Sequence, residues 1–266
     1  MPRTARTLVL ANQKGGVAKT TTTLNLGVAL HEMGYRVLAV DLDPQSNLSM
    51  SQGIDVEGLE LTMFDVLVGG RPMQELIRAR EIDIVPAGIE LAGAELALTA
   101  TIGRERALQR AIAPLRDAYD YVLIDTPPSL GLLTVNAMVA SDGVIVPVQC
   151  EYLSLRGLAQ LRETLGQVRE HLNPDASVVG ILPTMYDART VHAREAIGLL
   201  EEAFGDLLFR TRVGKTVRFA EAPAGGTSVL AYEPDGQASR WYRQLAAEVV
   251  ERPSTAPVGG AQKAAA

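Results

Sequence analysis

Two lysines on a glycine-rich loop are the residues of this chain best suited to chemistry. The loop consists of Lys14, Gly15, Gly16, Val17, Ala18, Lys19, Thr20 and Thr21. It lies between an apolar run and a helical run, and a strand, a glycine-rich loop and a helix N-terminus together form an anion cradle. Lys19 can reach the β and γ phosphates of a nucleoside triphosphate, and the Thr20 hydroxyl can bind Mg²⁺. The sequence therefore predicts a nucleotide site, with Lys14 opening the loop.

Position 18 departs from the general phosphate-loop pattern, which has Gly directly before the functional lysine. This chain has Ala18 there, and its methyl group crowds a place where the backbone must approach phosphate. The competing interpretation is a flexible turn that carries two solvated lysines. The flanking strand and helix, together with two acidic motifs, favour the nucleotide site.

Carboxylates follow two further apolar segments. Asp41 and Asp43 follow the run 37–40 and share one face of a strand, so both should stand at the mouth of the phosphate site. There they can hold the Mg²⁺ shell and orient an attacking water. Asp125 closes the run 121–124 in the Walker B arrangement, which binds Mg²⁺ directly or through water. The alternative for the first pair is a capped strand end, where the acids only accept bonds from backbone donors.

Six apolar segments alternate with stretches of helical period and predict the framework that carries these motifs. The strand segments are 8–11, 37–40, 82–85, 121–124, 144–148 and 178–182. They predict one α/β domain, residues 1–252, with a mostly parallel twisted sheet, helices on both faces and a ligand at the carboxyl ends of the strands. Helices are expected at 21–33, 153–172 and 237–250, and only short helices at 59–80.

Composition limits the class of protein. The 266 residues are 47% hydrophobic and 5% aromatic, so the core must be built from Ala, Val, Leu and Ile, as in helix-covered parallel sheets. No apolar run approaches the roughly 20 residues that span a bilayer, and no signal-like segment opens the chain, so we expect a cytoplasmic protein. The one cysteine, Cys150, excludes an internal disulfide. Residues 253–266 have no apolar face and are expected to be disordered.

Taken together, the motifs resemble the deviant Walker A ATPases of the ParA/Soj partition group. The resemblance rests on the loop 14–21, on DLDPQ at 41–45 and on DTPPSLG at 125–131. It continues through AGAE at 92–95, PVQCEY at 147–152, TMYDAR at 184–189 and VRFAEAP at 217–223, and so spans about residues 7–250. It implies the deviant Walker A P-loop NTPase fold, a homodimer that forms on binding ATP and Mg²⁺, and slow, partner-stimulated hydrolysis of ATP to ADP and phosphate.

The same resemblance implies a role for each site residue. Lys14 is the lysine that reaches across an ATP-sandwich dimer to the partner's nucleotide, and Asp43 positions the hydrolytic water. Asp125 supports the metal through water, and Asp41 shapes the metal shell. The remaining phosphate, metal and adenine contacts are implied for Lys19, Thr20, Met185 and Val213.

A basic segment near the end of the chain is a candidate DNA-contact surface. The formal charge of −6 argues against indiscriminate binding to nucleic acid, so a local patch is needed. The stretch 207–218 contains no acid and carries Arg210, Arg212, Lys215 and Arg218. Arg189 and Arg218 match positions that the family uses for sequence-independent contact with double-stranded DNA. The alternative is a solvated basic face that pairs with Glu195, Glu201 and Glu221.

The leading hypothesis is a switch for chromosome or plasmid partition, in which the ATP-bound dimer binds nucleoid DNA and a ParB-like centromere-binding protein triggers hydrolysis. One alternative is a ParA-like ATPase that positions a protein cargo. Another is a MinD-like membrane ATPase, for which residues 253–266 offer no amphipathic segment. Metallocluster chemistry lacks paired cysteines, and a repressor would need an extension before the first strand. We therefore expect a cytoplasmic, nucleoid-associated protein with no membrane partner.

Overall fold

A computed structural model describes residues 4–150 and 154–252. These residues form a seven-stranded sheet in the order β3-β4-β2-β5-β1-β6-β7. The strands are β1 (Arg6–Leu10), β2 (Val37–Asp41), β3 (Arg78–Ala79), β4 (Asp83–Val85), β5 (Tyr121–Asp125), β6 (Gly143–Gln149) and β7 (Val178–Thr184). All neighbouring pairs are parallel except β3 with β4, which is antiparallel.

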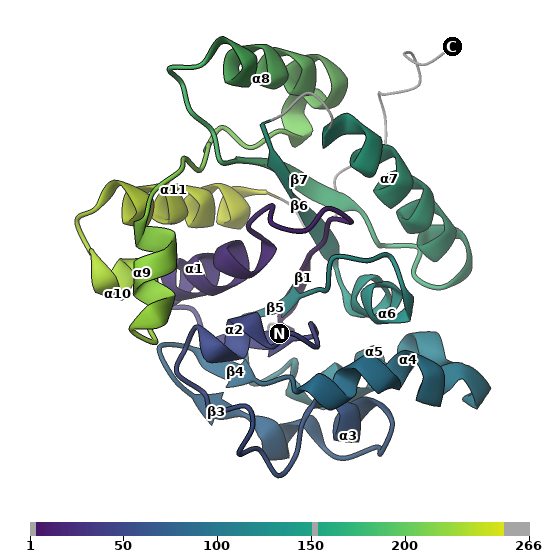
Figure 1. The fold of residues 1–266 in the computed structure, drawn as a ribbon. Helices are drawn as coiled ribbons and strands as arrows, with labels where there is room; N and C mark the ends of the chain where they lie inside the picture. Colours follow the sequence, from purple (N-terminus) through teal and green to yellow (C-terminus); the bar gives the residue numbers. More distant parts are fainter. Residues whose placement is uncertain (1–3, 151–153, 253–266) are drawn as a thin grey trace.

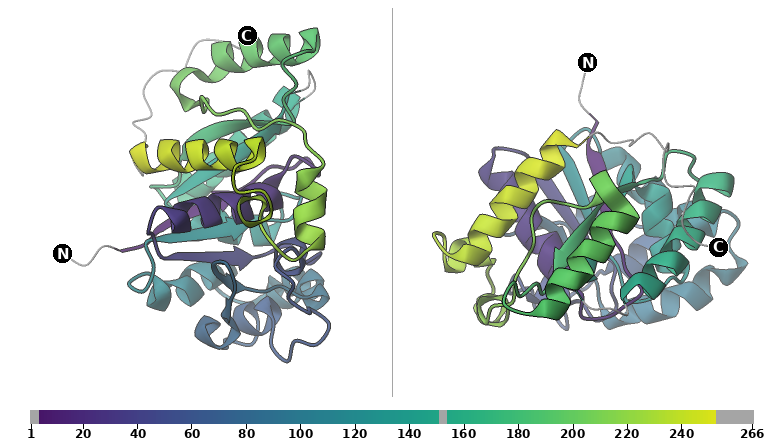
Figure 2. Two further views of the ribbon diagram at one scale, coloured as in Figure 1. Left: turned by 90° about the vertical axis from the view of Figure 1, so that its left-hand side faces the viewer. Right: turned by 90° about the horizontal axis from the view of Figure 1, so that it is seen from above.

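Helices cover both faces of this sheet (Figures 1 and 2). One face carries α1 (Lys19–Glu32), α2 (Asn47–Met50), α9 (Arg218–Ala224), α10 (Val229–Tyr232) and α11 (Gln237–Glu251). The other carries α3 (Met63–Leu67), α4 (Ala94–Ala97), α5 (Ala107–Ile112), α6 (Leu132–Ala140) and α7 (Ser154–His171). The helix α8 (Val191–Phe204) lies beyond β7. Short 3₁₀ turns are η1 (Met73–Leu76), η2 (Ile89–Gly93), η3 (Leu98–Ala100), η4 (Arg104–Arg106), η5 (Ala113–Leu115) and η6 (Gly205–Leu207).

The two helical layers create two hydrophobic cores. Along β1, Leu8 and Leu10 belong to the core that includes residues of α1 and α11, whereas Val9 belongs to the core that includes residues of α5, α6 and α7. All three side chains are 0% exposed. A parallel strand buried on both faces needs such a continuous apolar run, which explains why the central strands lack polar alternation.

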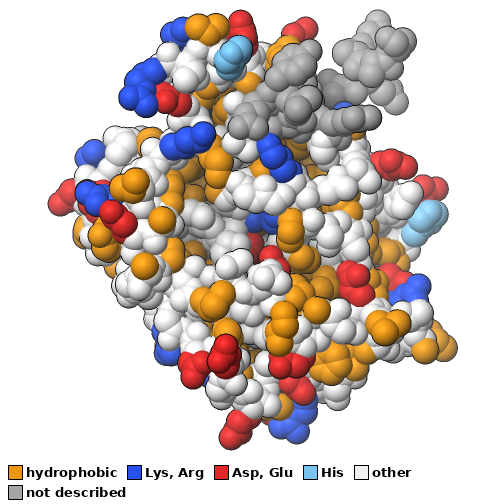
Figure 3. Space-filling model, in the orientation of Figure 1, with side chains coloured by type: hydrophobic (Ala, Val, Ile, Leu, Met, Phe, Trp, Pro, Cys, Tyr) orange, Lys and Arg blue, Asp and Glu red, His pale blue; other side chains and the backbone are white. Residues whose placement is uncertain are grey.

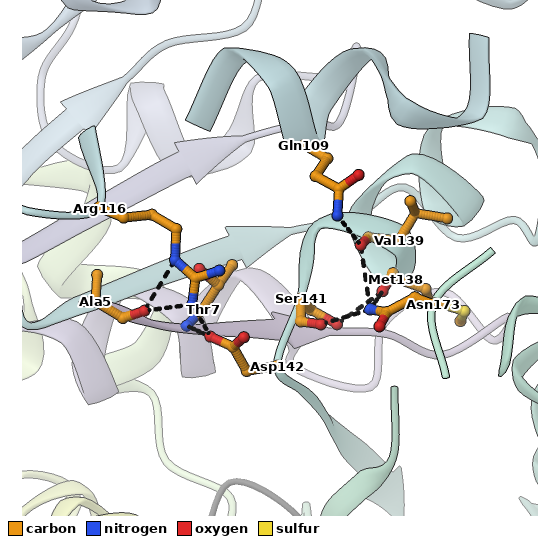
Figure 4. A network of polar contacts seen from close by, with 9 residues as sticks. All are labelled: Ala5, Thr7, Gln109, Arg116, Met138, Val139, Ser141, Asp142 and Asn173. Atoms are coloured by element: carbon orange, nitrogen blue, oxygen red, sulfur yellow. Dashed lines mark hydrogen bonds and ion pairs between the residues drawn. The ribbon is translucent and has the colours of Figure 1, made fainter. Parts of the chain in front are cut away.

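Polar contacts fix the loops at the amino ends of the central strands (Figure 4). The Arg116 guanidinium donates to the Ala5 carbonyl at 2.8 Å and to Asp142 at 2.6 Å, and Asp142 also accepts from the backbone N–H of Thr7. The side-chain amide of Asn173 donates to three carbonyls, including that of Ser141 at 2.8 Å. This end of the sheet is tied together, and the motif residues lie at the opposite, carboxyl ends of β1, β2 and β5.

The sequence-based framework is confirmed with one correction. The six expected strands and three expected helices are present to within about two residues, and Gly34, two residues beyond the end of α1, has a φ of 91°. The segment 59–80 holds the short α3 and η1 but also the strand β3, which was not expected. A two-residue strand is too short to show an alternation of apolar and polar residues, and its pairing with β4 is a tertiary contact. The expected disordered tail at 253–266 lies outside the described residues. Among those described, no helix is both long and apolar enough to cross a membrane.

Candidate nucleotide-binding site

The glycine-rich loop connects β1 to α1 and faces the viewer in Figure 1. Two of its residues have left-handed backbone conformations, Gly16 with φ 71° and Ala18 with φ 68° and ψ 34°. Left-handed residues in a loop turn successive N–H groups toward one side and make an anion-binding concavity. Ala18 directly precedes α1, so the positive end of the helix dipole closes that concavity. The loop has the backbone of a phosphate cradle.

The Lys19 side chain lies inside the loop. It is 7% exposed, and its ammonium donates to the backbone carbonyl of Lys14 at 3.4 Å. Burial lowers the pKa of Lys19, while the charges of Asp125 and Asp43 act in the opposite direction. The ammonium is therefore positioned to bind phosphate oxygens that enter the concavity.

Thr20 and Asp125 lie beside this lysine, and their side-chain oxygens are potential metal ligands. Thr20 Oγ1 donates to Asp125 Oδ2 at 2.6 Å, and Thr23 Oγ1 donates to Asp125 Oδ1 at 3.3 Å. Burial and the neighbouring charge of Asp41 raise the pKa of Asp125 to about 8, against the lowering effects of Thr20 and Lys19. Mg²⁺ binds oxygen ligands and would supply the positive charge that this buried carboxylate needs. The donor set fits the predicted metal.

Asp41 ends β2 directly opposite Asp125 in β5, and Asp43 follows two residues later. Both carboxylates are buried, with Asp41 0% and Asp43 7% exposed, so they lie deeper than the open mouth that the sequence suggested. Asp41 accepts bonds from the N–H of Asp43 at 3.1 Å and from the N–H and hydroxyl of Ser49 at 3.0 and 2.7 Å. Burial raises the pKa of Asp41 to about 6, although these bonds lower it. Asp41 thus holds the Asp43 loop against α2.

Lys14 differs from Lys19 in exposure and in its partners. Its side chain is exposed, and its ammonium donates to Gln149 Oε1, at the end of β6, at 3.0 Å. Its backbone N–H donates to Asn12 Oδ1 at 3.0 Å. The two lysines of one loop are therefore held by different partners, one inside the loop and one at its rim.

The expected adenine contacts come together beyond β7. Met185 follows the strand with a left-handed φ of 53°. The N–H of Tyr186 donates to the Val213 carbonyl at 3.0 Å, and the N–H of Val213 donates to the Pro183 carbonyl at 2.9 Å. These bonds place Met185 and Val213 on adjacent segments at one end of the sheet. Contact of these two residues with adenine stays a prediction.

The candidate DNA-contact residues occupy three separate places. Arg189, Arg212 and Lys215 lie around the turn that follows β7, Arg210 faces the end of α11, and Arg218 begins α9. Lys215 is exposed, and each arginine has a carboxylate partner. The pairs are Arg189 with Asp187 at 2.8 Å, Arg210 with Glu251 at 3.3 Å, Arg212 with Glu201 at 2.9 Å and Arg218 with Glu221 at 2.6 Å. Figure 3 shows blue and red side chains side by side over the loop that leads into α8.

The expected alternative pairing is met in part. Glu201 and Glu221 do bind arginines of the basic segment. Glu195 lies instead against His192 at 3.7 Å. Contact of these arginines with DNA stays a prediction.

Residues to which the sequence analysis gave no individual role hold this site together. The hydroxyl of Thr184, at the end of β7, donates to the Val17 carbonyl at 3.1 Å, and Thr126 donates to the Leu10 carbonyl at 2.8 Å. Ser49 organises the acidic strand end through Asp41. Each is a small polar residue at a strand end or next to a motif, which is the signal that could have pointed to it.

Comparison with known proteins finds relatives that cover most of the chain. Residues 5–178 match the family model described as AAA domain. The sporulation initiation inhibitor protein Soj of Bacillus subtilis is 45% identical over 91% of this chain and 97% of its own. The chromosome partitioning protein ParA of Caulobacter vibrioides is 43% identical over 93% and 94%.

A solved structure is similar as well. The structure described as cobyrinic acid a,c-diamide synthase from Mycobacterium smegmatis, with bound ADP and magnesium, superposes with a TM-score of 0.83. It is 40% identical and covers 93% of this chain and 94% of that one. The names of these relatives differ although the fold is shared, so biological output has to be argued from the site. By its motifs, fold and relatives, this chain belongs to the ParA/Soj family of P-loop ATPases.

Proposed function

We propose that the protein is an ATP-dependent dimerising switch that partitions chromosome or plasmid DNA. The observation that carries the proposal is the opposite placement of two lysines in one loop. Lys19 is buried within the loop, whereas Lys14 is exposed and bonds Gln149 at the rim. A lysine at the rim can extend to the phosphates of a second copy placed face to face with the first. In Figure 3 the hollowed middle of this face shows a few blue and red atoms among white and orange ones, and most of the other charged side chains lie toward its margins.

Different residues of one protomer perform different parts of ATP hydrolysis. Bound Mg-ATP would supply the transferable γ-phosphate and a metal that neutralises its charge. Lys19 binds phosphate oxygens, and Thr20, oriented by Asp125, presents its hydroxyl to the metal. Asp43 orients the attacking water, and Asp41 holds the backbone of Asp43 by accepting its N–H.

The duration of the ATP-bound state makes this chemistry a switch. Phosphate-loop switches without a supplied activating group hydrolyse about once per hour. A ParB-like centromere-binding partner that speeds hydrolysis would then decide when the dimer separates. The ATP-bound dimer is the signal, and its release moves the cargo.

DNA binding by this switch requires an exchange of partners. The arginines of the basic segment bind carboxylates of their own chain, and DNA phosphates would replace those carboxylates. A dimer offers two copies of the surface, so about four phosphates neutralised per subunit would give a log–log salt slope of about −7. A monomer has half that footprint and dissociates more readily.

Size measurements with a slowly hydrolysed ATP analogue and Mg²⁺ test the dimer. Sedimentation velocity should show a dimer for the wild-type chain and a monomer for Lys19→Ala, which cannot bind the phosphates. Lys14→Ala should still bind the analogue but remain monomeric. A wild-type chain that stays monomeric at saturating analogue would refute the switch.

Retention on non-specific duplex DNA tests the basic surface. With the analogue present, Arg218→Glu should lose retention while nucleotide binding persists. The control is Arg71→Glu, which reverses an exposed charge paired with Glu75, outside the basic segment. Equal retention by Arg218→Glu and Arg71→Glu would remove the basic segment from the proposal.

A further inference from the structure

The Asn12 side chain completes the hydrogen-bond ladder between β1 and β6 at the point where the chain turns into the phosphate loop. Leu10 of β1 pairs with Ile145 of β6, and the N–H of Ala11 donates to the Ile145 carbonyl at 3.2 Å. The next acceptor along β6 on that side is the Pro147 carbonyl. Asn12 Nδ2 donates to it at 2.7 Å, so a side-chain amide takes the place of the backbone donor.

The other end of the same amide holds Lys14. Asn12 Oδ1 accepts the Lys14 N–H at 3.0 Å, and Asn12 is only 6% exposed. Both functions of the buried amide are therefore used, one on β6 and one on the loop. The Lys14 ammonium in turn binds Gln149 Oε1, two residues beyond Pro147 on β6. The Lys14 backbone is thus connected to β6 through Asn12, and the Lys14 ammonium binds β6 directly at Gln149.

We propose that Asn12, assisted by Gln149, is the positioning residue that sets the direction in which Lys14 leaves the loop. The inference rests on the proposed function, in which Lys14 reaches the nucleotide of a second copy. Phosphate capture depends on Lys19 and on the amides of residues 15–20, whereas the loop amide that Asn12 binds is that of Lys14. Asn12 therefore governs the joining of two subunits more than the binding of nucleotide to one.

The size of the effect follows from the symmetry of the pair. A binding equilibrium weakens in inverse proportion to the fraction of molecules that are competent. If loss of the tether leaves Lys14 correctly directed about a tenth of the time, each of the two crossing lysines weakens dimerisation about tenfold. Because a two-fold dimer uses both lysines, its dissociation constant should rise up to about a hundredfold.

The test compares analogue binding with analogue-dependent dimerisation in the full chain. Asn12→Ala removes both bonds, and Asn12→Asp keeps an acceptor for the Lys14 N–H but loses the donor to Pro147. The matched control is Asn173→Ala, which removes an amide that ties carbonyls at the amino ends of the strands. Analogue affinity is measured at concentrations where each chain is monomeric, and dimerisation is measured by sedimentation at saturating analogue.

We expect Asn12→Ala to keep its analogue affinity within about threefold while its dimer dissociation constant rises at least tenfold. Asn12→Asp should lie between Asn12→Ala and wild type, and Asn173→Ala should lower the unfolding midpoint without changing dimerisation. Gln149→Ala should weaken dimerisation in the same sense, which provides a second variant if Asn12→Ala does not fold.

Three results would overturn the inference: unchanged dimerisation in Asn12→Ala, an equal loss of analogue affinity and dimerisation, or the same loss in Asn173→Ala. Failure of the proposed function looks different, because the wild-type chain would then stay monomeric with the analogue, and both proposals would fall. A wild-type dimer that Lys14→Ala abolishes but Asn12→Ala leaves intact would overturn only the role of Asn12.

Discussion

The backbone conformation at Ala18 makes a quantitative prediction about the stability of the phosphate loop. Ala18 has φ 68° and ψ 34°, a left-handed conformation that costs a residue with a Cβ about 1–2 kcal/mol. Replacing it with glycine removes that cost but gives the unfolded chain back about 0.4–1 kcal/mol of conformational entropy. Ala18→Gly should therefore stabilise the protein by about 0.5–1 kcal/mol.

Gly16 provides the opposite change in the same loop. Its φ is 71°, and a Cβ added there would meet no heavy atom within 4 Å. Gly16→Ala introduces the conformational cost without a clash, so it should destabilise by about 0.5–1 kcal/mol. The double variant should return close to wild-type stability.

Thermal unfolding without nucleotide is the appropriate assay, because a bound ligand would add its own stabilisation. For a domain of this size, 1 kcal/mol shifts the midpoint by about 2 °C. We expect the Ala18→Gly midpoint to rise and the Gly16→Ala midpoint to fall by about 1–2 °C each. A lower midpoint for Ala18→Gly, or a higher one for Gly16→Ala, would refute the strain argument.

Two further predictions concern other parts of the fold. Glu248 accepts hydrogen bonds from the N–H groups of Arg210 and Thr211 and from the Thr211 hydroxyl. Burial alone would raise the pKa of Glu248, but these hydrogen bonds lower it below the ordinary 4.5. Its stabilisation is present above pH 4.5 and is lost as pH falls through the lowered pKa, so Glu248→Gln should cost about 1–3 kcal/mol at neutral pH in urea unfolding. This difference should shrink in acid, and a pH-independent difference would contradict the assignment. Gly180→Ala should cost about 1–3 kcal/mol, because the added methyl overlaps the ring of Phe209. In the same assay Gly198→Ala, which meets no atom within 4 Å, should stabilise α8 by about 0.5–1 kcal/mol; equal effects at the two glycines would contradict the clash.

The predicted framework held because its signals are local and repeated. Continuous apolar runs indicate strands buried on both faces, and long helical periods indicate the crossover helices. The missed strand β3 has two residues, Arg78 and Ala79, and exists through its pairing with Ile84 and Asp83. A pairing partner several residues away leaves no periodic trace in so short a segment.

Part of the site could be read in the same way. The spacing of Lys14, Lys19 and Thr20 within one loop indicates a phosphate site, because the chemistry follows from neighbours along the chain. The loop geometry adds a detail that a motif cannot express. Ala18 sits in a left-handed conformation, which gives a physical reason why glycine is the usual residue there.

The partners of the charged side chains depend on contacts between distant segments. Asn12 meets Pro147 across 135 positions of the chain, and Arg210 meets Glu251 across 41. Asp41 was expected to shape a metal shell, but its carboxylate oxygens accept hydrogen bonds from Ser49 and from the Asp43 backbone. The sequence determines which chemistry each residue can perform, because that depends on residue type and on near neighbours along the chain. The position of Lys14 at the rim is settled only when β1 and β6 lie side by side, because its ammonium binds Gln149 at the end of β6.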